Sequence, residues 1–142
     1  MPDYDHANIF ARILRGELPC HKVYEDQHTL SFMDVMPRAD GHVLVIPKAP
    51  ARTLLEAEVP DVAVTFAVVQ KVARAVKDAM QADGITLHQF NEQAGGQVVF
   101  HWHVHVLPRW DGVALRPHTA QMAPNDVLAA QAQKIRDALA AG

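Results

Sequence analysis

The sequence lacks several features that would define its class at once. Cys20 is the one cysteine in 142 residues, which excludes an internal disulfide and fits a reducing compartment such as the cytoplasm. The formal net charge of −3 argues against a nucleic-acid partner, which favours a basic face. No apolar run reaches the roughly 18–20 residues of a membrane span, and the opening MPDYDHANIF resembles neither a signal nor a transit peptide. We therefore expect a cytoplasmic protein that binds neither nucleic acid nor membrane.

Apolar residues make up 49% of the chain, enough for the core of one domain over residues 1–142. Helical spacing of apolar residues predicts helices over 7–17 (ended by Gly16), 51–57, 61–82 and 124–141, the last capped by Asn125 or Asp126. Strand patterns cover 21–35 (two strands around a turn at 26–28), 41–48, 85–90 and 97–108, with a hairpin loop at 91–96. Because strands and helices do not alternate strictly, we expect an α+β fold with a mostly antiparallel five-stranded sheet, one long helix and terminal helices.

Residues 101–105 read His-Trp-His-Val-His. Alternation at a period of two is typical of a strand and places His101, His103 and His105 on one face. The opposite, core-facing side would hold Phe100, Trp102, Val104 and Val106. Three partly desolvated imidazoles destabilise a fold unless each is hydrogen-bonded, and their charged forms repel one another.

The residues alone leave three interpretations of this histidine row. It is a set of buried, hydrogen-bonded strand histidines, or a metal site, since neutral imidazole binds zinc and histidines two apart on a strand can share an ion. The third interpretation is nucleophilic catalysis, because a side chain with a pKa near 6.5 is largely neutral at pH 7 and its neighbours can transfer protons. Neither a CxxC nor an HExxH motif accompanies the row.

The run HWHVHVL matches the His-φ-His-φ-His-φ-φ pattern of the histidine triad (HIT) superfamily of nucleotide hydrolases and transferases. Three longer segments also resemble that family in the same order: IFARILRGELPCHKVYED, SFMDVMPRADGHVLVIPK and NEQAGGQVVFHWHVHVLPR. The resemblance covers most of residues 8–110, whereas the final thirty residues match poorly. It implies the HIT-like fold.

The resemblance implies a role for each histidine. His103 would attack the α-phosphorus of a nucleoside phosphoester or phosphoramidate, and water would hydrolyse the nucleotidyl-histidine intermediate. His105 would contact the phosphate or the departing group, His101 would hold the orientation and tautomer of the nucleophile, and His42 would support the row from the neighbouring strand. No metal ligand and no cofactor is implied.

The resemblance also implies a substrate-binding set, each member of which has a plain structural alternative. Gly95 and Gly96 would bring backbone N–H groups close to a phosphate, or simply form a turn. Asp34 would accept hydrogen bonds from the ribose hydroxyls, or end a strand at the surface. Asn91 and Gln97 match polar positions near the phosphate, and each could instead serve the loop or face solvent. The base would be flanked by apolar residues that could equally be core, namely Ile9, Phe10, Ile13, Phe32 and Val35.

Two parts of the sequence depart from the family pattern, and Arg109 bears on the class of substrate. The stretch 8–11 replaces the zinc-binding cysteines of some members, so we expect no structural zinc there, and Val98 replaces a serine of the phosphoramidase branch. Arg109, in Pro-Arg, would steady an extended phosphate chain or lie at the surface. The implied substrates are purine nucleoside phosphoramidates, acyl-adenylates or dinucleoside polyphosphates, and the implied assembly is a homodimer. The alternatives are a non-catalytic nucleotide sensor and a metal-dependent hydrolase that uses the histidine row as ligands.

Overall fold

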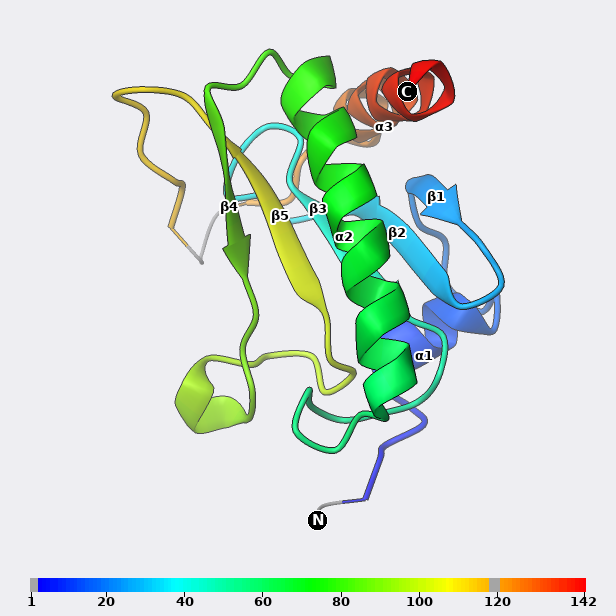
Figure 1. Cartoon of the computed structure of the whole chain (residues 1–142). Coiled ribbons are helices and arrows are strands. Elements are labelled where there is room, and N and C mark those ends of the chain that lie inside the picture. Colours follow the sequence, from blue (N-terminus) through cyan, green and yellow to red (C-terminus); the bar gives the residue numbers. More distant parts are fainter. Residues whose placement is uncertain (1–2, 118–120) are drawn as a thin grey trace.

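The computed structural model describes residues 3–117 and 121–142. Five strands form one sheet in the order β1-β2-β3-β5-β4, and each neighbouring pair is antiparallel (Figure 1). The strands are β1 (Lys22–Glu25), β2 (Thr29–Met33), β3 (Val43–Pro47), β4 (Gly84–His88) and β5 (Val104–Arg109). The predicted α+β fold with an antiparallel five-stranded sheet is confirmed.

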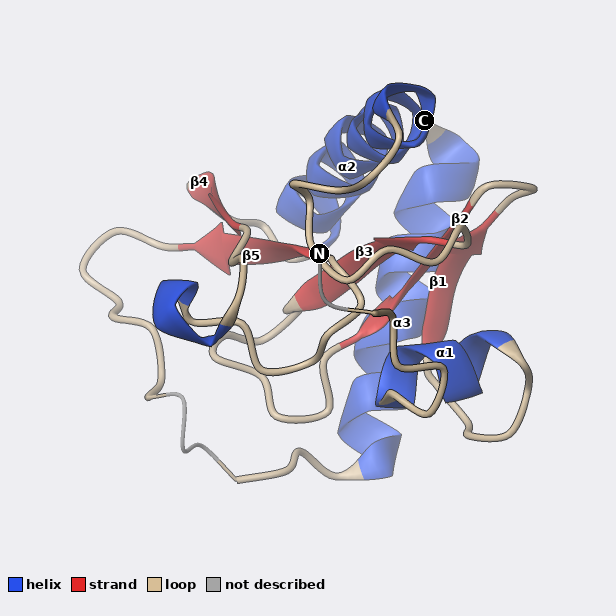
Figure 2. Cartoon of the chain, turned by 90° about the horizontal axis from the view of Figure 1, so that it is seen from below, coloured by secondary structure: helices blue, strands red, loops and turns tan. Residues whose placement is uncertain are grey.

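Three α-helices and one short 3₁₀ turn complete the described chain: α1 (Ile9–Leu14), α2 (Val59–Ala79), η1 (Gln93–Gly95) and α3 (Asn125–Ala141). The long helix α2 lies along one face of the sheet with α3 packed beside it, and α1 lies on the opposite face (Figures 1 and 2). The predicted long helix and both terminal helices are therefore present. None of the helices within 3–117 and 121–142 has the length and apolar character needed to cross a membrane.

The helix predicted over 51–57 is wrong, because other partners take the backbone groups that a helix would use. Ala51 O accepts from Trp102 N at 3.1 Å and Arg52 O accepts from Gln97 Nε2 at 2.7 Å. The N–H of Leu55 donates to the Thr53 hydroxyl at 3.1 Å. Competition of this kind between side chains and helical hydrogen bonds favours turns, and the segment is a series of turns and bends.

The strand predicted over 97–108 forms only in its second half. Before residue 104 the backbone carbonyls are occupied by side chains, since Val99 O accepts from Gln97 Nε2 at 3.0 Å and His101 O accepts from His103 Nδ1 at 2.7 Å. The N–H of Trp102 donates to Ala51 O at 3.1 Å. With these groups engaged, no ladder can start before Val104. Of the three alternating histidines, only His105 therefore lies within β5.

The sheet separates two hydrophobic layers, and this separation determines where a site can lie. Val43, Val45, Val104 and Val106 face α2 and α3 in the larger core cluster. The alternate residues of β2 and β3 face α1 instead and pack around Phe10. His105 belongs to this second face, because it pairs with Leu44 of β3. The short α1 covers only part of that face, which leaves the remainder open.

Candidate active site

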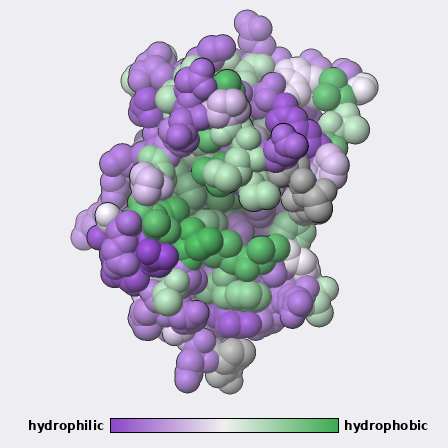
Figure 3. All heavy atoms as spheres, turned by 180° about the vertical axis from the view of Figure 1, so that it is seen from behind, coloured by the Kyte–Doolittle hydropathy of each residue, from purple (hydrophilic) through white to green (hydrophobic). Residues whose placement is uncertain are grey.

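A cavity of about 510 Å³ opens on the face of the sheet opposite α2. Figure 3 shows this side of the molecule, where apolar atoms gather in a hollow across the middle. Its volume lies within the range of roughly 300–1,000 Å³ that is typical of small-molecule sites. The lining residues are Ile9, Phe10, Ile13, Leu18, Pro19, Cys20, Phe32, Met33, Asp34, Val35, Met36, Arg38, His42, Leu44, Phe90, Gly96, Val98, Val99, His103 and His105.

His103 lies in the wall of this cavity with its protonation pattern fixed by one neighbour. Its Nδ1 is 2.7 Å from the backbone oxygen of His101. A carbonyl oxygen can only accept, so Nδ1 carries the proton and Nε2 carries the lone pair. Burial lowers the pKa of His103, against a smaller opposing effect of this hydrogen bond. The ring is therefore neutral at pH 7, with Nε2 available as a nucleophile.

His101 is fully buried and does not line the cavity. Its Nε2 donates to Pro47 O at 2.7 Å, and its Nδ1 accepts from the hydroxyl of Tyr4 at 2.6 Å. Burial lowers the pKa of His101 from 6.5 to about 4. Both ring nitrogens are thus engaged, and His101 contacts His103 through its backbone carbonyl rather than its ring.

His42 and His105 form a directed pair beside the nucleophile. The backbone N–H of Arg38 donates to His42 Nδ1 at 3.0 Å, so the proton of the neutral His42 ring lies on Nε2. That nitrogen is 2.9 Å from His105 Nδ1, which must accept when both rings are neutral. The remaining proton of His105 is then on Nε2, where it can donate a hydrogen bond to a substrate oxygen or nitrogen.

Asp34 lies next to this pair at the end of β2. Its Oδ2 is 3.5 Å from His42 Nε2, and its Oδ1 accepts from the N–H of Met36 at 2.9 Å. Burial raises the pKa of Asp34, and the hydrogen bond from Met36 partly offsets the rise. At neutral pH a carboxylate in this position can accept hydrogen bonds from a ligand in the cavity.

The residues predicted to flank a base all line the cavity, but in two different ways. Phe10 and Phe32 are buried and belong to the α1-side core, so they would form the back of a base slot. Ile9 and Val35 are 52% and 43% exposed at its rim. Exposed apolar side chains that border a concave site are suited to contact a flat ligand.

Four predicted binding residues do not line the cavity: Asn91, Gly95, Gln97 and Arg109. Gln97 is buried, where its Oε1 accepts from Glu92 N at 2.7 Å and its Nε2 donates to the backbone oxygens of Arg52 and Val99. Asn91 accepts from Leu54 N and exchanges hydrogen bonds with Gln89. Both amide side chains therefore hold the 89–99 segment in place.

The backbone amides of the glycine turn are also occupied. The N–H groups of Gly95 and Gln97 donate to Glu92 O, and that of Gly96 donates to Gln93 O, all at 3.0 Å. In this conformation they cannot donate to a phosphate. Phosphate binding by the amides of Gly95 and Gly96 stays a prediction, and it would require another conformation of the turn.

Sequence reasoning did not identify several residues that shape the site. Tyr4 and Arg38 contact the histidines directly, and neither is among the predicted site residues. The contact between Tyr4 and His101 joins positions 97 residues apart, so no local pattern indicates it. The apolar residues missed in the cavity wall are Leu18, Pro19, Cys20, Met33, Met36, Leu44, Phe90, Val98 and Val99.

One group in the described residues has the spacing of a metal site. A ligand atom from each of Asp34, His42 and His105 lies within 4.8 Å of the others. Imidazole and carboxylate are ligands of zinc and other transition metals. A cation here would replace the hydrogen bond between His42 and His105. Of the histidine row only His105 belongs to this group, and both ring nitrogens of His101 are bonded elsewhere.

Known proteins resemble the chain over nearly all of its length. A solved structure of a Hit-like protein from Bartonella henselae, described as involved in cell-cycle regulation, matches with a TM-score of 0.90 and 48% identity, covering 96% of this chain and 99% of that one. A Zn-bound histidine triad family protein from Mycobacterium smegmatis matches with a TM-score of 0.83 and 33% identity, covering 95% and 94%.

A curated relative and a family model agree with these structures. The adenylylsulfatase HINT3 of Arabidopsis thaliana is 38% identical over 120 residues, which are 80% of this chain and 61% of that protein. The family model of the HIT domain matches residues 15–112, a range that contains all four histidines of the site. The chain therefore belongs to the HIT family.

Proposed function

We propose that this protein hydrolyses purine nucleotides at the α-phosphorus through a nucleotidyl intermediate on His103. The observation that carries the proposal is the hydrogen bond from His103 Nδ1 to the His101 carbonyl, which leaves a lone pair on Nε2 in the wall of a nucleotide-sized cavity. A buried neutral imidazole in this arrangement is an activated nucleophile that needs no separate base. The family relationship and the plant adenylylsulfatase support hydrolysis as the reaction class.

The reaction divides into two displacements at phosphorus. His103 Nε2 attacks the α-phosphorus and the bond from phosphorus to the leaving group breaks, while His105 Nε2–H donates a hydrogen bond to the departing oxygen or nitrogen, which takes any proton it needs from solvent. Water then attacks phosphorus, the phosphorus–nitrogen bond breaks, and the proton of the water is released to solvent. The His42–His105 contact orients the donor, and the polar groups around it would stabilise the charge that develops in each transition state.

The intermediate provides a direct test. Rapid quench of the wild-type chain with an adenylate that carries a fluorescent leaving group should trap one AMP on His103, detected by mass spectrometry of peptides. His103→Asn should form no adduct and lose several orders of magnitude in kcat, each decade being about 1.4 kcal/mol of barrier, while it still binds AMP. An adduct on another histidine, or normal turnover by His103→Asn, would refute the proposal. A wild-type chain that binds AMP without turnover would be a nucleotide sensor.

A second candidate is a metal-dependent hydrolase, favoured by the spacing of Asp34, His42 and His105. The relative from Mycobacterium smegmatis is named as Zn-bound. In this chain a zinc ion would supply a polarised water. Turnover that is abolished by a chelator and restored by zinc would support this candidate, whereas turnover that survives the chelator would support covalent catalysis by His103.

We also propose that the chain acts as a cytoplasmic homodimer. Strand β4 pairs with β5 alone, so its other edge is available to a second copy. Apolar side chains lie exposed near that edge and on α2, including Leu87, Phe66 and Val59. A single cysteine supports a reducing compartment. Sedimentation equilibrium should give twice the mass of the chain, and a monomer at micromolar concentration would contradict the dimer.

A further inference from the structure

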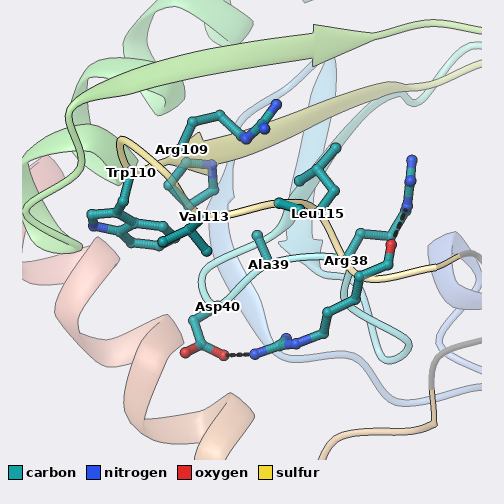
Figure 4. Close-up of a pocket in the computed structure, with 10 residues that line it drawn as sticks. Arg38, Ala39, Asp40, Arg109, Trp110, Val113 and Leu115 are labelled. Atoms are coloured by element: carbon teal, nitrogen blue, oxygen red, sulfur yellow. Dashed lines mark hydrogen bonds and ion pairs between the residues drawn. The ribbon is translucent and has the colours of Figure 1, made fainter.

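A second, smaller pocket of about 200 Å³ adjoins the nucleotide cavity. The loop before β3 contributes Arg38 and Asp40, and the end of β5 contributes Arg109 and Trp110 (Figure 4). The segment after β5 closes the pocket, including Arg116. Arg38 also lines the large cavity, so one side chain borders both spaces.

This pocket carries an excess of positive charge. Three arginines line it against one carboxylate, and the ion pair of Arg116 with Asp40 at 2.6 Å accounts for one of them. Within residues 3–117 and 121–142, neither Arg38 nor Arg109 pairs with a carboxylate. The other five positions of the sequence are Met, Pro, His, Thr and Ala, none of which is acidic. Two guanidinium groups therefore remain without a counter-charge.

Both of these guanidinium groups are held by one hydrogen bond and keep further donors for a ligand. Arg38 Nε donates to Arg116 O at 2.8 Å, while Arg116 N donates to Arg38 O at the same distance. Arg109 Nη1 donates to the hydroxyl of Thr86 at 3.2 Å. In the described chain their other side-chain nitrogens make no hydrogen bond. A positioned guanidinium with spare N–H groups is suited to bind phosphate or a related oxyanion.

The pocket lies on the leaving-group side of the proposed reaction. The backbone of Arg38 bonds to His42, and His42 bonds to His105, the proposed donor to the leaving group. His105, Leu107 and Arg109 share one face of β5, because side chains alternate along a strand. Leu107 is buried between the other two, and Arg109 lies roughly 13 Å beyond His105 at about 3.3 Å per residue. A leaving group that extends from His105 would therefore reach the pocket past Arg38, which borders both spaces, and Arg109 lies on the far side of that pocket.

We infer that this pocket is a subsite for an anionic leaving group, so that the preferred substrates are nucleotides whose departing group carries phosphate or a similar oxyanion rather than a neutral amine. The inference rests on the proposed function, since it assigns the part of the substrate that leaves. Arg38 would be the specificity-determining residue, because it borders both spaces, and Arg109 would contact a longer anionic group.

Binding to a catalytically inactive chain tests the subsite without turnover. In the His103→Asn background, calorimetry should compare AMP, which has no leaving group, with ATP, whose two distal phosphates would occupy the pocket. Adding Arg38→Gln should weaken ATP binding about tenfold and AMP binding less than twofold. Arg38→Gln keeps the backbone N–H that bonds to His42. Arg74→Gln is the matched control, because Arg74 is exposed on α2 and should leave both affinities unchanged.

Rates of turnover distinguish binding of the leaving group by Arg38 from a purely structural role of this residue. With histidine 103 intact, Arg38→Gln should lower kcat/KM about tenfold for adenosine 5′-phosphosulfate, which loses an anion, and less than twofold for adenosine 5′-phosphoramidate, which loses ammonia. Arg38→Lys should recover part of the loss. Equal losses for both substrates, or equal weakening of AMP and ATP, would overturn the subsite. Failure to bind AMP at all would overturn the proposed function instead.

Discussion

The protonation state of each site histidine follows from one neighbour of fixed polarity. His103 faces a carbonyl, which can only accept, and His42 faces a backbone N–H, which can only donate. His101 faces the Pro47 carbonyl, so its Nε2 carries the proton and its Nδ1 accepts from the Tyr4 hydroxyl. Three similar imidazoles can therefore have different roles, because their surroundings and not their chemistry distinguish them.

Asp34→Asn tests recognition of the ribose. The substitution keeps the size of the side chain but removes the charge that strengthens hydrogen bonds from the two hydroxyls, and hydrogen bonds to charged groups contribute roughly 1.5–3 kcal/mol. We expect the Kd for AMP to rise by about tenfold at pH 7.5, at about 1.4 kcal/mol per decade. Affinity for the 2′,3′-dideoxy analogue should hardly change. If both ligands lose affinity equally, Asp34 does not contact the ribose.

Tyr4→Phe tests whether the hydroxyl of Tyr4 positions His101. Without it, the buried Nδ1 of His101 has no donor, which costs roughly 1–3 kcal/mol. We expect urea denaturation to show a loss of about that size, together with a several-fold lower kcat at unchanged KM. Tyr24→Phe is the matched control, because its hydroxyl donates to Asp26 on the far side of the sheet and its loss should affect stability alone. Equal kcat values for both variants would exclude a positioning role.

At the scale of elements, the sequence correctly predicts the helices and strands whose conformation is determined by the burial of apolar side chains. The strand predicted over 41–48 and the helix predicted over 61–82, which form over 43–47 and 59–79, follow from their apolar side chains. The predictions for 51–57 and 97–103 fail because polar side chains bond to the backbone there. Such bonds depend on a few side-chain torsions and on partners far along the chain, so periodicity cannot reveal them.

Prediction of the site residues likewise succeeds where the sequence has a local pattern and fails where it has none. The histidine row and the segment GHVLV around His42 carry a local pattern. His42, His103 and His105 line one cavity, whereas His101 does not. Asn91 and Gln97 are polar residues beside a glycine turn, and nothing in the sequence distinguishes a side chain that binds phosphate from one that secures a loop. Tyr4 enters through a contact between distant segments, which no local pattern contains. Arg38 contacts His42 through its backbone N–H, which its residue type does not reveal.

The pair Gly95 and Gly96 allows a matched test of the turn. Gly96 has φ of +99°, and an added Cβ would lie 3.3 Å from the Phe90 ring, whereas a Cβ at Gly95 meets nothing within 4 Å. We expect Gly96→Ala to lower the free energy of unfolding by about 1 kcal/mol or more, and Gly95→Ala to be neutral or slightly stabilising. Urea denaturation of both variants would measure this. A larger loss for Gly95→Ala would show that the turn adopts another conformation.

The whole molecule should lose stability as the pH falls below neutrality. His101 has a pKa of about 4 in the folded chain against 6.5 for an ordinary histidine, so between these values the unfolded state binds more protons. The contribution is fully present above pH 6.5 and lost by about pH 4. It amounts to about 3 kcal/mol at 1.36 kcal/mol per pKa unit, and the lowered pKa of His103 acts in the same direction.

Urea denaturation at several pH values between 7 and 4 would measure this loss. A His101→Gln chain, although less stable at pH 7, should show a flatter dependence over the same interval because the titrating group is gone. Parallel curves for the two chains would mean that other groups account for the pH dependence and that His101 is accessible to protons in the folded state.

Because backbone atoms determine the tautomers of His103 and His42, most substitutions at positions 101 and 38 leave these tautomers unchanged. Every amino acid carries a carbonyl, so no substitution at position 101 can delete the acceptor that faces His103. Likewise, only proline at position 38 would remove the N–H that faces His42. Substitution at position 38 can therefore change the side chain that borders the leaving group, while the N–H that faces His42 persists. The chemistry of the site can be retained while its preference for a leaving group evolves.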